Sequence, residues 1–156
     1  MVKEISKGLK WTFLIYFVVS LIFGVLLFFL VEKYLEWFGI VLFYSPIVEI
    51  FPNLFYGGLF GGALLAFAIA SFFAWREIEW EKVKIVMIMN IVWNMLGAFI
   101  FFWVTFLKGW PVHPMTLMHL ILFFGFLATF IFFYIQHEKE QPVPRNDTEP
   151  IRVAED

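Results

Sequence analysis

Four stretches of about 20 residues carry no Asp, Glu, Lys or Arg, and they restrict this chain to very few folds. A helix needs about 20 apolar residues to cross the hydrocarbon of a bilayer. Within hydrocarbon every backbone polar group has to be paired inside the protein, which an α-helix achieves. We therefore predict an all-α integral membrane protein, in which residues 1–135 form a bundle of four transmembrane helices with spans at about 11–31, 54–75, 85–107 and 117–135.

Composition excludes several other classes of protein. Of the 156 residues, 62% are hydrophobic and only 15% are charged, whereas a soluble domain is closer to half apolar and a quarter charged. The net charge is −2 and the basic residues form no stripe, so nucleic acid is excluded as a partner. Cysteine is absent, which excludes thiol redox chemistry and Cys-ligated metals.

Basic residues at the ends of the spans predict the orientation, because loops rich in Lys and Arg stay in the cytoplasm. The two loops that would face outward carry only Lys33 and Lys108. We therefore expect a multi-pass protein of the cell membrane with both termini in the cytoplasm. Residues 136–156, which are polar and contain three prolines, are predicted to form a disordered cytoplasmic tail. The other nine basic residues all lie in the N-terminal arm, in the loop between the second and third spans, or in the tail: Lys3, Lys7, Lys10, Arg76, Lys82, Lys84, Lys139, Arg145 and Arg152.

The segment 37–52, between the first two spans, is apolar but too short to cross the bilayer. It is interrupted by Ser45, Pro46 and Glu49. We predict that it lies in the outer interface or dips into the membrane as a re-entrant segment. A fifth span is the alternative, and it would put the two termini on opposite sides of the membrane.

The second span carries a ridge of small side chains at every fourth position. Small residues at this spacing allow two helix backbones to approach closely, and packing then replaces the hydrophobic effect that lipid cannot supply. The ridge is expected to face protein, either another helix of the same bundle or a second protomer or larger membrane complex. Its members are Gly58, Gly62, Ala66, Ala70 and Ala74.

Polar side chains recur on one face of the first and third spans. Asn90, Trp93 and Asn94 share a face of the third span, and Tyr16 and Ser20 lie one turn apart on the first. An unpaired amide in hydrocarbon costs several kcal/mol, so both Asn side chains are expected to point into the bundle. Counting from the cytoplasmic ends places Tyr16 level with Asn90 and Ser20 level with Asn94. This cluster is interpreted as interhelical hydrogen bonding, as a polar anchor for a ligand, or as a water-filled path.

Metal and haem sites are not indicated. His119 is the one histidine within a span, and His113 and His137 flank that span. A haem in a bundle takes axial ligands from facing helices, and a metal needs more ligands than these histidines and Glu49 supply. We predict no metal and no cofactor, although a bound lipid is compatible with the sequence.

The pattern of residues favours a protein without catalytic residues. Ion-driven transport usually requires an ionisable residue within a span, and no span contains Asp, Glu, Lys or Arg. None of the spans carries a Ser-His-Asp, HExxH or paired-carboxylate arrangement. The leading prediction is a structural or accessory subunit that packs through the Gly/Ala ridge. The alternative is a binder or carrier of a small amphipathic ligand such as a lipid, quinone or sterol-like molecule.

Overall fold

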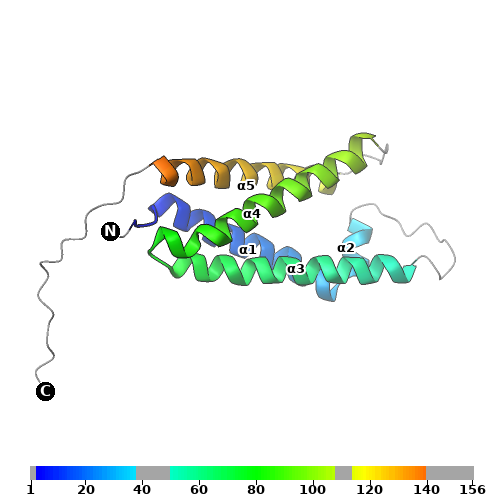
Figure 1. Cartoon of the computed structure of the whole chain (residues 1–156). Helices are drawn as coiled ribbons and strands as arrows, with labels where there is room; N and C mark the ends of the chain where they lie inside the picture. Colours follow the sequence, from blue (N-terminus) through cyan, green and yellow to red (C-terminus); the bar gives the residue numbers. More distant parts are fainter. Residues whose placement is uncertain (1–2, 38–49, 108–113, 140–156) are drawn as a thin grey trace, which may run out of the picture.

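The computed structural model describes residues 3–37, 50–107 and 114–139, and shows a bundle of long α-helices (Figure 1). Four helices are long and apolar enough to cross a membrane: Lys7–Phe29, Phe55–Arg76, Trp80–Phe102 and Thr116–Lys139. The predicted four-helix membrane bundle is thereby confirmed. In order, the elements are α1 (Lys7–Phe29), α2 (Val31–Trp37), α3 (Ile50–Arg76), α4 (Trp80–Phe102), the π-helix η1 (Trp103–Leu107) and α5 (Pro114–Lys139).

The helices extend further than their charge-free runs. α4 begins at Trp80 and not at residue 85, and α5 continues to Lys139 beyond residue 135. Charged residues end an apolar run, but they do not end the hydrogen-bonded helix once its side chains reach the polar headgroup region. At the N-terminus of α1, the Ser6 hydroxyl oxygen accepts a hydrogen bond from the Leu9 N–H at 3.3 Å, which satisfies one free donor of the first turn.

The predicted interfacial or re-entrant segment is only partly visible. A helix of seven residues, α2, follows α1 directly, and Ile50 to Pro52 already belong to the first turn of α3. Proline is tolerated there because the first turn needs no N–H donor. Residues 38–49 of that segment, and residues 140–156 of the predicted tail, lie outside the described residues.

The spans associate as two pairs. α1 makes most of its contacts with α3, and α4 makes most of its contacts with α5, whereas contacts between the pairs are far fewer. Figure 1 shows α4 running obliquely to α3 and α5. Side chains that are level by residue count are therefore not level in space.

The backbones of α1 and α3 approach each other closely at Gly61, beside the predicted ridge. A Cβ atom at Gly61 would lie 2.6 Å from the Phe28 nitrogen and 2.9 Å from the Leu27 carbonyl carbon. On α1, a Cβ atom at Gly24 would lie 3.0 Å from the Leu65 nitrogen. Glycine is required at Gly61 because the backbone of α1 occupies the space that a side chain would need.

The predicted ridge itself makes looser contacts. A Cβ atom at Gly58 would meet nothing within 4 Å, and one at Gly62 would only touch the Phe28 ring at 3.7 Å. Ala66 is exposed, Ala70 is half-buried and only Ala74 is buried. Within the bundle the predicted ridge therefore does not form the close contact with α1, because the face of α3 that meets α1 is rotated by about one residue.

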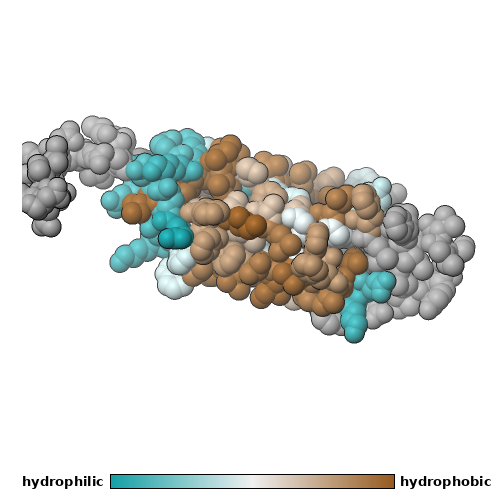
Figure 2. Space-filling view, turned by 90° about the horizontal axis from the view of Figure 1, so that it is seen from below, coloured by the Kyte–Doolittle hydropathy of each residue, from teal (hydrophilic) through white to brown (hydrophobic). Residues whose placement is uncertain are grey.

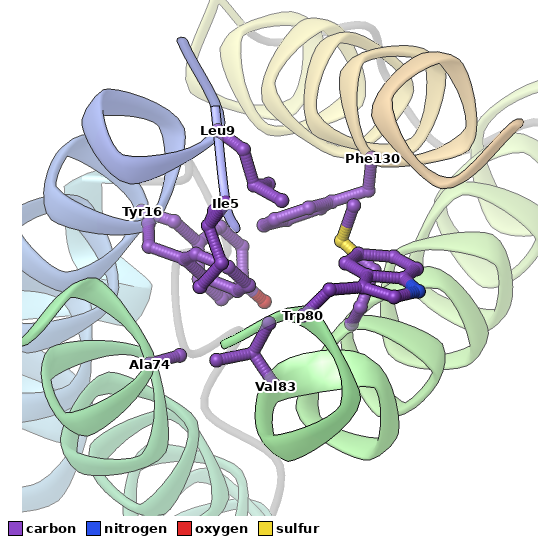
Figure 3. Close-up of a cluster of buried hydrophobic side chains, with 9 residues drawn as sticks. Ile5, Leu9, Tyr16, Ala74, Trp80, Val83 and Phe130 are labelled. Atoms are coloured by element: carbon purple, nitrogen blue, oxygen red, sulfur yellow. The ribbon is translucent and has the colours of Figure 1, made fainter. Parts of the chain in front are cut away.

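Two clusters of buried apolar side chains hold the bundle together. The smaller cluster contains Leu27, Tyr34 and Leu64, near α2. The larger cluster lies at the end of the bundle where α1 begins and α5 ends (Figure 3). It joins all four spans and consists of Ile5, Leu9, Phe13, Tyr16, Ala74, Trp80, Val83, Met87 and Phe130.

The surface agrees with a membrane environment. The face shown in Figure 2 is predominantly hydrophobic along its middle, and most of its hydrophilic residues gather at the end that carries the start of α1 and the end of α5. Large apolar side chains such as Ile121, Phe132 and Phe29 are more than 60% exposed. Exposed apolar surface on this scale is typical of a protein whose sides contact lipid or another membrane protein.

Candidate functional site

The two asparagines of α4 lie inside the bundle and connect three helices. Asn90 donates a hydrogen bond from Nδ2 to the Ser71 hydroxyl of α3 at 3.2 Å. Asn94 donates from Nδ2 to the Tyr16 hydroxyl of α1 at 3.3 Å and to the backbone oxygen of Asn90 at 2.7 Å. Ser20, one turn along α1 from Tyr16, is also buried. The amides are therefore paired across the two helix pairs, one turn away from the register that residue counting gives.

Two polar atoms of this region have no partner among the described residues. These atoms are the Asn90 side-chain oxygen and the Trp93 indole nitrogen, and both are buried. The Trp93 ring lies between Phe60 and Phe67 of α3, with centroid distances of 5.2 and 4.8 Å. A buried donor and a buried acceptor left unpaired are costly, and such groups usually mark a bound water or ligand.

A cavity lies where the two buried clusters meet, between the two helix pairs. The space available to the centre of a water-sized sphere is about 40 Å³. A water needs roughly 10–15 Å³ by this measure, so about three waters would fit. The lining residues come from all four spans: Tyr16, Val19, Ser20 and Phe23 of α1, Phe60 and Leu64 of α3, Trp93 and Asn94 of α4, and His119, Leu122, Phe123 and Phe126 of α5.

A histidine of α5 lines the cavity and is hydrogen-bonded to a tyrosine of α2. His119 is buried on α5, and its Nε2 atom is hydrogen-bonded to the hydroxyl of Tyr34, which α2 carries into the bundle. The imidazole ring stacks on Phe101 with an interplanar angle of 16° and meets the edge of Phe23. This contact joins α2 to α5.

The structure brings together most of the residues that the sequence singles out. Tyr16, Ser20, Trp93 and Asn94 all line the cavity, and Asn90 lies beside it, bonded to Ser71. The contact between His119 and Tyr34 was not anticipated. Tyr34 resembles an interfacial aromatic in the sequence, and no local pattern links residues 85 positions apart.

No formal charge reaches the cavity, because its lining contains no Asp, Glu, Lys or Arg. The charged groups gather at the end of the bundle, where Lys82 pairs with Glu79 at 3.3 Å and Lys84 pairs with Glu138 at 2.8 Å. In the same turn, the Ile78 N–H donates to the Glu77 carboxylate and lowers the pKa of that carboxyl. The site can therefore offer hydrogen bonds and apolar contacts, but not ionic ones.

Metal ligation finds no support in the part of the chain that the structure describes. Within residues 3–37, 50–107 and 114–139, no three His, Asp or Glu side chains lie close enough together to hold an ion. His113 and Glu49, which the sequence offers as further ligands, lie outside those ranges.

This fold and site define a class: an all-α, four-helix membrane protein with a small uncharged cavity between two helix pairs. No family model, no curated protein and no solved structure matches the chain. Function therefore has to be inferred from the site itself.

Proposed function

We propose that this chain binds a small, neutral amphipathic ligand, such as a lipid, between its two helix pairs. The observation that carries the proposal is the cavity itself, with the Tyr16, Ser20 and Asn94 cluster on one side and His119 on the other. Ligand sites are typically apolar with a few convergent polar groups, and they occur between the helices of bundles. A role without catalytic residues fits this arrangement.

The chemistry of the lining restricts the ligand. An ionised headgroup would be uncompensated there, since no side chain of opposite charge lines the cavity. The accessible lining is apolar, so a ligand hydroxyl or carbonyl group would have to replace the bond between Asn94 and Tyr16 or reach the buried, unpartnered indole of Trp93. The cavity holds only such a headgroup, so an attached hydrocarbon chain would leave between the helix pairs, where contacts are few.

Mass spectrometry of lipids that co-purify with the full chain tests this proposal. Asn94→Leu is expected to reduce recovery of a bound neutral lipid at least about tenfold, because the ligand loses its polar anchor. Met95→Leu is the matched control, since Met95 is 51% exposed on the same helix and should retain the ligand.

A second pair of variants tests the cavity by volume. Val19→Phe would fill the cavity from α1, whereas Val18→Phe adds the same bulk to the exposed face of that helix. Only the first should lose the ligand. Equal recovery of lipid from the wild type, Asn94→Leu and Val19→Phe would refute ligand binding at this site.

A second candidate function is assembly with another membrane protein or a second copy of this chain. The supporting observation is the loose part of the predicted ridge, where Gly58 meets nothing within 4 Å and Ala66 is exposed. If this face packs against another protein, Gly58→Leu should shift the assembly to a smaller mass in native mass spectrometry, without loss of folded protein. An unchanged mass would show that the ridge faces lipid.

We also propose that both termini lie in the cytoplasm of the cell. The support is the distribution of Lys and Arg, together with the hydrophilic end of the bundle that carries the start of α1 and the end of α5. The chain has no native cysteine, so Lys7→Cys and Arg145→Cys give unique labelling sites. Both should resist an impermeant thiol reagent in intact cells and react after lysis. Reaction of either in intact cells would contradict this orientation.

A further inference from the structure

A short arm before α1 is fastened to the turn between α3 and α4. The Ile5 N–H donates to the Ile78 oxygen at 2.8 Å, and the Trp80 N–H donates to the Lys3 oxygen at 2.7 Å. These bonds form an isolated antiparallel bridge between Glu4 and Glu79. The arm, residues 3–6, thus lies against the end of the bundle where α5 finishes.

His137 of α5 is buried beneath this arm, and its hydrogen bonds define its protonation state. The Ser6 N–H donates to His137 Nε2 at 3.1 Å, and His137 Nδ1 is bonded to the Phe133 oxygen at 2.9 Å. A backbone N–H can only donate and a carbonyl oxygen can only accept. The ring is therefore neutral, with its single proton on Nδ1. It stacks on Trp80 with a centroid distance of 4.8 Å.

A second proton on the His137 ring would break only one of its two hydrogen bonds, the one with the Ser6 N–H. The bond from Nδ1 to Phe133 is made in either state, but protonated Nε2 is a donor that faces the Ser6 N–H donor. The positive end of the α1 dipole would also repel the imidazolium. The last turn of α5 favours a cation, but it cannot restore the lost bond between α5 and the arm.

We propose that His137 is a pH-sensitive latch: its neutral ring holds the N-terminal arm against α5, and its protonation releases the arm. Histidine is the side chain whose charge ordinarily changes between pH 5 and 8. The contact is present at the upper end of that range and is lost as the pH falls. Because α1 and α5 belong to different helix pairs, the latch also joins the two pairs at this end.

Other titratable groups surround the latch and have to be separated from it. Glu138 is the nearest carboxylate along the chain, and it accepts a hydrogen bond from the Trp80 indole at 3.2 Å while pairing with Lys84. At this end of the bundle, the titratable groups on the elements packed around His137 are Lys3, Glu4, Lys7 and Lys10 of the arm and α1, Glu77, Glu79, Glu81, Lys82 and Lys84 of the turn and α4, and Tyr134, Glu138 and Lys139 of α5.

Hydrogen exchange of the full chain in detergent micelles measures whether the arm is attached. The readout is protection of the Ile5 and Trp80 amides, which bond between the arm and the turn, corrected for the intrinsic pH dependence of exchange. Between pH 7.5 and pH 5.5 the wild type should lose about tenfold in protection. His137→Phe keeps an aromatic ring beside Trp80 but no ring nitrogen, so its protection should not change with pH.

Two variants of Ser6 isolate the bond itself. Ser6→Ala removes the hydroxyl but keeps the N–H, so the change with pH should persist. Ser6→Pro removes the N–H, and proline suits the φ of −62° at this residue, so the change should disappear. Glu138→Gln removes the charge of the nearest carboxylate along the chain, and the change of amide protection with pH should persist in this variant. The proposal is overturned if amide protection in the wild type does not fall between pH 7.5 and pH 5.5. It is also overturned if the same fall occurs in His137→Phe or Ser6→Pro.

Nitrogen NMR of the wild type provides a test that needs no variant. With His137 sequentially assigned, its Nε2 signal at pH 7.5 should be that of an unprotonated nitrogen, and its Nδ1 signal that of a protonated one. A protonated Nε2 at that pH would overturn the latch even if every variant failed to fold.

Discussion

Gly61→Ala is expected to destabilise the bundle by about 2 kcal/mol or more, although it adds a single methyl group. The new carbon would lie 2.6 Å from the Phe28 nitrogen, and a backbone atom in a helix cannot move aside as a flexible side chain can. The two helices would have to separate, which costs packing along the whole α1–α3 contact. Unfolding in mixed detergent and SDS micelles, followed by circular dichroism, measures the loss.

Gly58→Ala is the matched control for this substitution. It makes the same chemical change one turn earlier on the same helix, where nothing lies within 4 Å of the added carbon. Replacing glycine by alanine within a helix favours folding by up to about 1 kcal/mol, so the control should be as stable as the wild type or more so. Equal stability of the two variants would contradict the close approach at Gly61.

Trp80→Ala should cost about 3–5 kcal/mol, the range for removing a fully buried aromatic side chain. Trp80 is 1% exposed and belongs to the cluster of Figure 3, and its ring packs against Tyr134 and His137 of α5. Its indole also donates to Glu138 at 3.2 Å. Removing it leaves a cavity at the place where all four spans meet.

Trp11→Ala controls for the general effect of losing a tryptophan from this protein. Trp11 is 63% exposed on α1, so its removal should change the free energy of unfolding by less than about 1 kcal/mol. Both variants can be compared with the wild type in the same micelle titration. A similar loss for Trp11→Ala and Trp80→Ala would mean that burial at Trp80 does not govern stability.

The number and type of the membrane helices follow directly from the sequence, because the bilayer imposes both a length and a backbone pairing rule. The apolar runs locate all four spans, and the structure confirms the helical bundle. Their ends are less predictable. Lys82 and Lys84 precede the third apolar run, but they belong to a helix that begins at Trp80.

The packing face of α3 could not be assigned from the sequence alone. Gly57, Gly58, Gly61 and Gly62 form two adjacent ridges, and both satisfy the small-residue pattern. Only the position of α1 distinguishes them, and its backbone lies against Gly61. Rotation of a helix about its axis depends on its neighbours, which local sequence does not encode.

In the candidate site, the burial of the polar side chains could be predicted from the sequence, but their hydrogen-bond partners could not. Asn90 and Asn94 had to face inward because of the cost of an unpaired amide, and both are buried. Their partners depend on helix tilt, which residue counting ignores. Contacts such as Ser6 with His137 join residues 131 positions apart at the end of the bundle, and no spacing rule could indicate them.

The pairing of α1 with α3, and of α4 with α5, has a consequence for how the protein is made. Each pair consists of consecutive spans, so most of the contacts of α1 and α3 are available before α4 is synthesised. Chains emerge from the ribosome from the N-terminus, and nearby segments associate faster than distant ones. We expect the first helical hairpin to insert and pack as a unit. Assembly then ends with the docking of the second hairpin, which closes the cavity last.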